Sequence, residues 1–437
     1  MTAQLHLVDT DLAEVPAAPA AQVPAQPLFG APVYYVGADS NAISELGVED
    51  LFAHRRRFGH RPHLTGAAGA AFIDTLEDIG LTGRGGGHFP VARKWRTVRT
   101  AGRNAVVVAN GAEGEPLSGK DAALLQLRPH LVLDGLACAA EALDATDAVI
   151  WLHEGAEATR ASIVHALAER RAAGLIEPQM RVVTGPARYL SGESSAIVQA
   201  LSGGPALPQF RLASAATSGV NGLPTLVQNV ETLARVALSA HSPEAFATST
   251  LVTVAVPGRR VVLELDRATQ LGDAIGSVLG STPLQAILIG GYGGSWAPWV
   301  DVSDVMLAES DMRDRGLSLG AGILVPLGAG QCGLEQTASI ISYLADSSAR
   351  QCGPCVFGLR GVADLVRDLA EKSSGRRDLP RLQRFLAEIN GRGGCHHPDG
   401  AVRMVASAVT TFAADISAHL AGRCLHDGAA HLGQRRG

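Results

Sequence analysis

Hydrophobic residues in the first half of the chain alternate between short runs and longer helical spacings. The run AVVVAN at 105–110 is apolar up to its last residue, as a strand buried on both faces requires. Residues 131–143 and 162–174 show helical spacing, whereas 148–154 and 181–185 are typical of strands. Strands that alternate with helices predict a mostly parallel sheet in an α/β domain.

The pattern changes in the second half of the chain. Strand-like runs with one short helix candidate (QLGDAIGSVL) predict a small α+β domain of the ubiquitin-like kind. Four later segments have apolar residues three or four apart and predict the helices of a bundle: 333–349, 357–375, 378–391 and 400–422. The start of the chain is rich in Ala, Pro and Gln, which predicts a flexible leader with nothing to bury. The expected divisions are a leader at 1–35, an α/β domain at 36–245, the small domain at 246–328 and a four-helix bundle at 329–425.

Composition narrows the class of protein. The 437 residues include 46% apolar and 18% charged residues, with a net charge of −5, so nucleic acid is not an expected partner. No apolar run approaches the roughly 20 residues of a membrane helix, and the acidic start does not resemble a secretory signal. We therefore expect a cytoplasmic protein without membrane insertion. Its six cysteines, two of them three apart, indicate thiol, metal or cluster chemistry rather than disulfides.

One segment is rich in glycine. TGRGGGHFPVARKW at 82–95 has four glycines in five positions around Arg84, followed by Lys94. Glycine permits close backbone approach, so consecutive N–H groups can point inward and bind a phosphate, with Lys94 as an added cation. An ordinary surface turn is the alternative interpretation.

Polar residues follow the buried strand and begin two later helices. Asn110, Glu113 and Glu115 lie where α/β sheets bind ligands, at the carboxyl end of a strand. GPARYLSGESSAI brings Glu193 into a helix start, and GLPTLVQNVET does the same with Asn229. Taken singly, each of these segments is also explained by a solvated loop or by helix capping.

Four motifs in order resemble a known family. GRGGGHFPVARKW, NGAEGEPLSGKD, YLSGESSAI and GLPTLVQNVET are similar to the motifs GRGGAGFPxGxKW, NADExEPGTxKDR, YxxGEETAL and GxPTxxNNVET. These belong to the NADH-binding flavoprotein subunit of complex I (its F subunit) and to its relatives in NAD-linked hydrogenases and formate dehydrogenases. The resemblance covers residues 75–420. It implies a Rossmann-like FMN-binding domain, a ubiquitin-like (SLBB) domain and a bundle that carries a [4Fe–4S] cluster.

The resemblance also implies site residues by position. Glu193 would orient the electron donor or the flavin edge, and Phe89 matches an aromatic residue that packs where NADH docks. The FMN phosphate and ribityl contacts would fall to Gly83, Arg84, Gly85, Gly86 and Lys94, and the rest of the flavin pocket to Asn110, Glu113, Tyr189, Gly192, Glu193 and Asn229.

The sequence departs from the family in places. Ala112 replaces an Asp, Ser194 replaces the second Glu of GEE, and His88 stands where the pattern has Gly. The family segment that helps to seat the dinucleotide is replaced by GGPALPQFRLAS at 203–214. FMN binding is therefore expected more firmly than NADH binding.

Three cysteines match the family's cluster motif, CGxCxPCRxG plus a distant Cys. These are Cys352, Cys355 and Cys395, whereas Ala349 stands where the first Cys belongs. A cubane cluster usually has four Cys ligands. Three interpretations stay open: a cluster completed by another ligand, relic cysteines without a cluster, or a redox dithiol. The donors available to complete a cluster are His396, His397 and Cys332.

The sequence as a whole predicts an NADH dehydrogenase-like flavin oxidoreductase. It would use FMN to oxidise NAD(P)H and pass electrons to a redox partner protein or a membrane-bound reductase, peripherally to a membrane complex. One alternative is a non-catalytic assembly subunit, which the losses at Ala112, Ser194 and Ala349 favour. Another is a flavoprotein that is reduced by a donor other than NADH.

Overall fold

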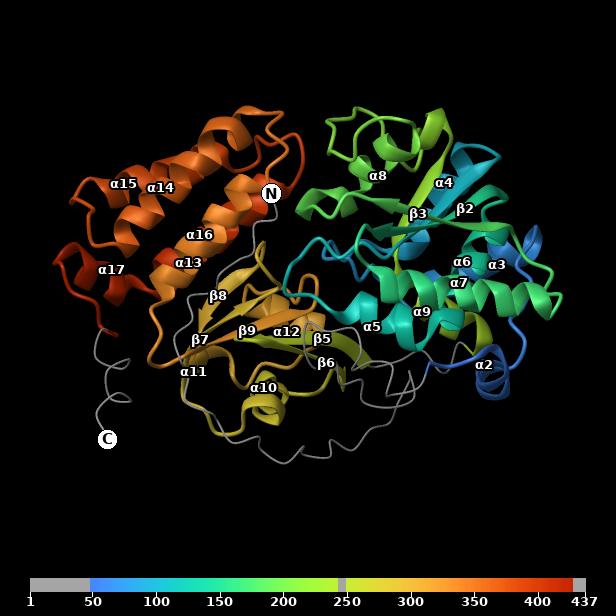
Figure 1. Cartoon of the computed structure of the whole chain (residues 1–437), viewed down its shortest axis with the longest axis horizontal. Coiled ribbons are helices and arrows are strands. Elements are labelled where there is room, and N and C mark those ends of the chain that lie inside the picture. Colours follow the sequence, from blue (N-terminus) through green and yellow to red (C-terminus); the bar gives the residue numbers. More distant parts are fainter. Residues whose placement is uncertain (1–47, 243–248, 427–437) are drawn as a thin grey trace.

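The computed structural model describes residues 48–242 and 249–426. The predicted leader at 1–35 lies outside the described residues. Three regions follow one another along the chain: an α/β region, a second region built on a mixed sheet, and a helical region. The first and third regions lie side by side above the second (Figure 1).

Four parallel strands form the sheet of the first region, in the order β3-β2-β1-β4. Val107 and Ala109 of β1 face the core formed with α3, α4, α6 and α9, whereas Val106 and Val108 face the core beneath α8. Both faces of β1 are thus covered, as its apolar run predicted. The elements are α2 (Leu51–Phe58), α3 (Ala67–Asp78), α4 (Val91–Ala101), β1 (Ala105–Asn110), α5 (Lys120–Leu127), α6 (Pro129–Ala142), β2 (Ala145–His153), α7 (Glu157–Ala172), β3 (Met180–Gly185), η1 (Tyr189–Gly192), α8 (Ser194–Leu201), η2 (Val220–Gly222), β4 (Thr225–Asn229) and α9 (Val230–His241).

The second region is a mixed five-stranded sheet, in the order β6-β5-β9-β7-β8. Strands β5 and β9 are parallel, and the other neighbours are antiparallel. The buried face of α10 packs against the apolar side of the sheet. The short strand β8 has no counterpart in the sequence pattern, since four residues show no clear alternation. The elements are β5 (Ser249–Val256), β6 (Arg259–Asp266), α10 (Leu271–Leu279), β7 (Leu284–Ile289), β8 (Ser295–Pro298), α11 (Trp299–Val302), α12 (Glu309–Asp314) and β9 (Ile323–Gly328).

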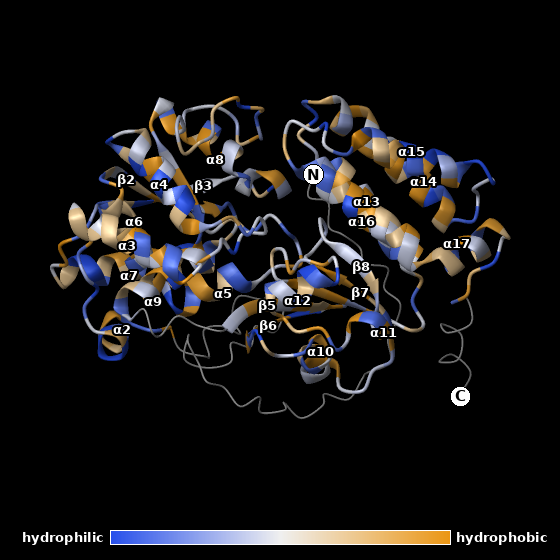
Figure 2. Cartoon of the chain, turned by 180° about the vertical axis from the view of Figure 1, so that it is seen from behind, coloured by the Kyte–Doolittle hydropathy of each residue, from blue (hydrophilic) through white to orange (hydrophobic). Residues whose placement is uncertain are grey.

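The third region consists of amphipathic helices whose hydrophobic and hydrophilic stretches are visible on α14 and α15 (Figure 2). The segment at 400–422, expected as one helix, is broken between α16 and α17. The buried ring of Phe412 occupies the break and packs against Trp296, with 5.3 Å between ring centroids. Gly333 makes room for this ring, because a Cβ there would lie 2.3 Å from it. The elements are α13 (Gly333–Asp346), the π-helical turn η4 (Pro354–Gly358), α14 (Leu359–Ala370), α15 (Asp378–Ile389), α16 (His397–Thr411) and α17 (Ala413–Leu420).

Length and hydropathy bear on membrane insertion. Within the described residues, no single helix is both long and apolar enough to cross a membrane. Among these same helices, only α16 and α17 taken together meet those criteria, and they are bent by 77° relative to each other.

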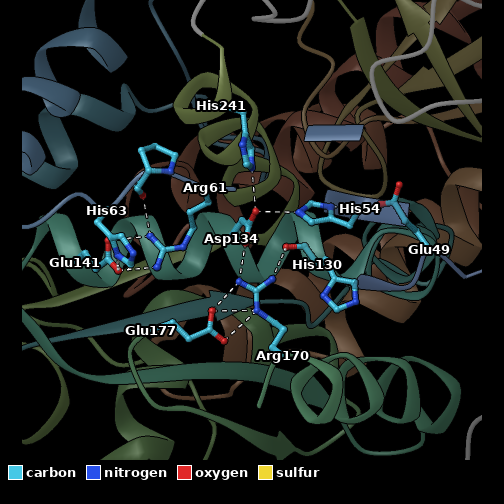
Figure 3. Close-up of polar contacts among 11 residues, drawn as sticks. Glu49, His54, Arg61, His63, His130, Asp134, Glu141, Arg170, Glu177 and His241 are labelled. Atoms are coloured by element: carbon cyan, nitrogen blue, oxygen red, sulfur yellow. Dashed lines mark hydrogen bonds and ion pairs between the residues drawn. The ribbon is translucent and has the colours of Figure 1, made fainter. Parts of the chain in front are cut away.

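A buried charged cluster joins four helices of the first region (Figure 3). Asp134 on α6 lies at its centre: its Oδ2 is 2.9 Å from His54 Nε2 on α2 and 3.0 Å from His241 Nε2 on α9. Its Oδ1 accepts a 2.6 Å hydrogen bond from Arg170 on α7, and Arg170 also pairs with Glu177. Since the carboxylate already binds a guanidinium and two imidazoles, we interpret this cluster as an ion-pair network that holds the helices together.

Candidate functional site

The topology of the first sheet defines where a ligand would bind. The chain runs outward from β1 to β2 and β3 and then returns, so that β4 lies on the other side of β1. The strand order therefore reverses between β1 and β4, and ligands of open α/β sheets bind beyond the carboxyl ends of the strands at such a reversal. Asn110 ends β1, Asn229 ends β4, and the two are paired in register. Two predicted site residues thus meet at this position.

The glycine loop lies over the same end of the sheet. Gly83 N donates a 2.9 Å hydrogen bond to Phe89 O, which closes the loop at its base. A Cβ on Gly85 would lie 3.3 Å from the Cβ of Asn229, so the loop backbone packs closely on the end of β4. Gly86 has a φ of +99°, which favours glycine. Gly87 faces open space, since nothing lies within 4 Å of a Cβ built there.

The loop that carries Gly192 closes on the loop after β1. Asn110 Nδ2 donates a 2.8 Å hydrogen bond to Gly192 O, and Asn110 Oδ1 accepts from Ala112 N at 3.2 Å. A Cβ on Gly192 would lie 2.7 Å from Ala112 O, so only glycine allows this approach. The four segments singled out in the sequence therefore converge at one edge of the sheet.

A buried charge network lies under this convergence. Glu231, at the start of α9, forms ion pairs with Arg84 Nε at 3.2 Å, with Lys120 Nζ at 3.1 Å and with Arg235. Although burial alone would raise it, these three cations hold the pKa of Glu231 below its usual value. Burial raises the pKa of Asp121, which also bonds Lys120 Nζ, to about 7.

No role for Lys120, Asp121 or Glu231 was apparent from the sequence. They lie in the motif segments SGKD and NVET. The signal that could have identified them is the presence of charged residues next to buried elements. Arg84 was expected at the phosphate, but its guanidinium is buried and donates to Glu231 and to Thr250 Oγ1. The backbone of Arg84 lies in the loop, whereas its side chain fixes the loop to α9.

Lys94 and Phe89 lie at the end of the glycine segment. Lys94 Nζ donates to Val227 O of β4, and burial lowers the pKa of Lys94 to about 8. The Phe89 side chain is 49% exposed, with the Arg93 guanidinium 5.6 Å from its ring centroid. His88 does not fill the glycine loop, because its Nδ1 lies 3.0 Å from Glu309 Oε1 in the second region.

Three of the predicted pocket residues use their polar groups within the protein. Glu113 accepts from the backbone N–H groups of Asp121 and Ala122 at 3.1 and 3.0 Å, at the start of α5. Glu193 caps α8 through Ser195 N at 2.8 Å. The hydroxyl of Tyr189 donates to Glu115 Oε1 at 2.7 Å, and its ring packs against the third region. These side chains shape the loops around the site, and their direct contacts to a ligand stay predictions.

The three cysteines of the predicted cluster motif come together where α13 ends and α14 and α16 begin. Burial raises the pKa of Cys355 to about 12, and the neighbouring thiols of Cys352 and Cys395 add to the shift. Burial also raises the pKa of Cys395, and the Glu193 carboxylate contributes to this shift. The Cys395 thiol therefore lies close enough to the Glu193 carboxylate for the two groups to interact electrostatically.

The structure distinguishes the donors proposed to complete this group. Ala349 supplies no ligand. His397 is buried and its Nε2 lies 2.9 Å from Leu344 O, whereas His396 is fully exposed beside Cys395. Cys332 precedes α13 and is separated from Cys352 by that whole helix, ~21 Å long at 1.5 Å per residue. Cys332 is therefore excluded, whereas His396 is the exposed donor next to Cys395, with its Nδ1 3.6 Å from Asp399 Oδ2.

Two stretches of the chain match family models. A family model described as the Nuo51 FMN-binding domain matches residues 76–238, and one described as the NADH-ubiquinone oxidoreductase-F iron-sulfur binding region matches 335–419. The F subunit of the NADH-quinone oxidoreductase of Salmonella typhimurium is 30% identical over 392 residues, covering 82% of this chain and 86% of the relative. Its counterpart in Streptomyces coelicolor is 28% identical over 376 residues, covering 80% and 83%.

A solved structure shows the same fold. The NAD⁺-reducing [NiFe]-hydrogenase in the H₂-reduced state has a chain that superposes with a TM-score of 0.74 at 26% identity. The match covers 85% of this chain but only 64% of the hydrogenase chain. By sequence and by fold, the chain belongs to the family of the F subunits of NADH-quinone oxidoreductases.

Proposed function

We propose that this chain is an FMN-dependent oxidoreductase that oxidises NAD(P)H and passes electrons to an iron–sulfur partner. The observation that carries the proposal is the convergence of the glycine loop, Asn110, Gly192 and Asn229 at the reversal of the first sheet. The family to which the chain belongs supports the same chemistry, since the relatives are NADH-quinone oxidoreductase subunits.

The residues present fit FMN. The loop at 83–87 offers backbone N–H groups beside open space at Gly87, and Lys94 is a buried cation next to it. Gln228 Oε1 is buried at the end of β4 and has no hydrogen-bond partner among the described residues, so a polar ligand group can satisfy it. When bound, FMN supplies hydride acceptance and single-electron release. We assign the phosphate to the loop backbone and Lys94, and the organic part to Asn110 and Asn229.

The nucleotide is expected on the solvent side of this pocket. Phe89 is 49% exposed and Phe210 is 75% exposed, so both offer aromatic faces. Glu193 is the residue we propose to orient the nicotinamide, held by its capping bonds to α8.

Electrons are expected to leave towards the third region. Cys352, Cys355 and Cys395 fit three of the four ligand positions of a [4Fe–4S] cluster, and His396 stands beside them. A redox partner protein, or a membrane-bound reductase to which the chain is peripheral in the cytoplasm, would accept the electrons. We further propose that 36–245 is the FMN domain, 246–328 a ubiquitin-like (SLBB) domain and 329–425 a four-helix bundle, with α17 as its bent end.

The visible spectrum of the purified protein tests the proposal. Flavin bands that bleach when NADH or NADPH is added anaerobically are the expected result. A Glu193→Gln variant should keep its flavin but reduce it more slowly, whereas Asp147→Asn, in an exposed ion pair with Arg181, should behave like the parent. A yellow protein whose flavin bands do not bleach with either nucleotide would mean that another donor reduces the flavin.

A specific observation favours a second function. Ala349 removes a cluster ligand, and Arg84, Glu113 and Tyr189 already use their polar groups within the protein. A non-catalytic assembly subunit would be colourless and would bind no FMN when titrated. Iron and sulfide analysis of anaerobic protein decides the cluster: the Cys355→Ser variant should hold less iron than the parent, and equal iron would contradict the ligand assignment.

A further inference from the structure

We propose that Cys332, His419 and Cys424 form a second metal site, for a divalent transition metal such as zinc, at the end of the helical region remote from the flavin pocket. Their ligand atoms all lie within 4.8 Å of one another. The site is independent of the proposed oxidoreductase function, and its residues lie outside the four loops that converge at the first sheet.

Three separate pieces of the chain supply the donors. Cys332 is the residue that precedes α13, His419 lies in the last turn of α17, and Cys424 lies in the segment that follows α17. Cys332 Sγ is 3.6 Å from His419 Nε2. Zinc bonds of ~2.3 Å to sulfur and ~2.0 Å to nitrogen place the ligands of one tetrahedral ion roughly 3.5 Å apart. The spacing of Cys332 and His419 therefore matches that of two ligands of one ion, and Cys424 lies within 4.8 Å of both.

The orientation of His419 suits metal binding. Its Nδ1 lies 2.9 Å from the carbonyl oxygen of Leu369, and a carbonyl can only accept, so the proton is on Nδ1. The lone pair of Nε2 then points towards the thiol of Cys332. Metal-binding histidines are commonly fixed in this way by a backbone carbonyl on the other ring nitrogen. The ring is 1% exposed, so its position is set by packing.

Backbone N–H groups point at both sulfurs. Burial raises the pKa of Cys332 to about 12, and the N–H groups of Leu334 and Glu335 in the first turn of α13 oppose this shift. Cys424 Sγ accepts from His426 N at 3.4 Å. The Nε2 of His426 in turn lies 2.7 Å from Asp415 Oδ1, which holds the segment against α17. Such donors support the thiolate that forms when a metal displaces the thiol proton.

The donor set favours zinc over harder ions. Two thiolates and an imidazole leave one tetrahedral position, which water can fill because Cys424 is only half-buried. Metal binding would release the two thiol protons to solvent and join the segment after α17 to the start of α13. The effect would be structural, because a metal that binds only the folded state stabilises it.

Metal analysis of the full-length chain, prepared with a thiol reductant, tests this site. A Cys352→Ser/Cys355→Ser/Cys395→Ser variant removes the motif cysteines, and it should still bind about one equivalent of zinc. Adding His419→Ala or Cys424→Ser to this background should abolish that zinc. Adding Cys138→Ala, which alters a buried thiol on α6, should leave it in place. Cobalt substitution should give thiolate-to-metal absorption only where zinc is retained.

Two outcomes would overturn the proposal. One is a zinc content that contradicts the assignment: the triple variant binds no zinc, or it still binds zinc after Cys424→Ser is added. The other is a Cys332–Cys424 disulfide, seen as the loss of two hydrogens by intact mass in reductant-treated protein that binds no zinc. Because these measurements involve no flavin, a failure of the oxidoreductase proposal would leave them unchanged.

Discussion

At the scale of single residues, Lys94 gives the sharpest test of where the phosphate binds. Lys94→Met should weaken FMN binding about tenfold or more, because a hydrogen bond to a charged group contributes ~1.5–3 kcal/mol. Burial lowers the pKa of Lys94 in the free protein to about 8. A phosphate favours the protonated amine, so FMN affinity in the parent should fall as pH rises above about 8. Flavin fluorescence titrations across that pH range measure both effects.

Riboflavin, which lacks the phosphate, is the matched control for Lys94. Its affinity should be the same in the parent and in Lys94→Met, and it should not depend on pH near 8. If the substitution weakens FMN and riboflavin equally, Lys94 does not contact the phosphate and acts only through its bond to Val227 O.

Glycine at position 192 is the second prediction at this scale. Gly192→Ala places a Cβ 2.7 Å from the carbonyl oxygen of Ala112, and a backbone atom cannot turn away. The variant should lose about 1–3 kcal/mol of unfolding free energy, as overpacked sites do, and bind FMN more weakly. Gly87→Ala adds the same methyl group where nothing lies within 4 Å. Urea unfolding of the flavin-free proteins should separate the two, and equal stabilities would contradict the close contact of the loops.

At the scale of elements, the network around Asp134 should dominate the stability of the helical layer. Asp134→Asn should lower the free energy of unfolding by about 3–5 kcal/mol, because it leaves buried cations without their partner. Asp147→Asn breaks a half-exposed pair with Arg181 and should cost only about 0–1 kcal/mol. Chemical denaturation of both variants gives the comparison, and similar losses would mean that the buried network contributes little.

The same network predicts a pH dependence of stability. Although burial alone would raise it, hydrogen bonds from His241 and His54 and the charge of Arg170 hold the pKa of Asp134 well below 3.8. The ionised Asp134 carboxylate therefore stabilises the folded state above pH 3.8, and this stabilisation is lost as pH falls through the folded-state pKa. His54 titrates with a pKa raised above 6.5, because Asp134 and Glu49 outweigh burial, so its contribution is lost as pH rises through the raised value. Denaturation at several pH values should show both slopes in the parent and a flatter curve in Asp134→Asn.

At the scale of the whole molecule, Glu115 joins the three regions. Its carboxylate, half-buried in the loop after β1, accepts from Tyr189 OH at 2.7 Å and from Tyr292 N in the second region at 3.0 Å. The Tyr189 ring packs on Tyr343 of α13 and His397 of α16. The flavin loops and the cysteine loops therefore share one buried joint, which fixes the distance between the proposed entry and exit of electrons.

Tyr189→Phe tests whether this residue serves the joint or the flavin. The variant leaves a partly buried carboxylate oxygen of Glu115 without its donor, so the free energy of unfolding should fall by about 1–3 kcal/mol relative to the parent. FMN affinity should change by less than about twofold, since the hydroxyl faces Glu115. Thermal unfolding and FMN titration measure the two effects. If FMN affinity is lost while stability is unchanged, Tyr189 lines the flavin pocket, as its motif predicts.

Several elements could be predicted because their cause is local. The buried strand at 105–110, the helix at α15 beginning at Asp378, and the alternation of strands and helices follow from hydrophobic spacing and caps. The break at Phe412 could not, because it depends on contacts with Trp296 and Gly333, far away in sequence. The network at Glu231 was missed for the same reason, since two of its three cations, Arg84 and Lys120, come from segments more than 100 residues earlier in the chain.

The sequence by itself determined the order of the motifs, the glycines that allow close approach and the three cysteines with an alanine in the fourth place. Those properties depend on which atoms each residue has. Only the tertiary structure decided that Arg84 turns inward and that Cys332 pairs with His419 instead of completing the cluster motif. Which partners a charged or sulfur-containing side chain meets depends on packing between distant segments, and the spacing of neighbours along the chain does not specify it.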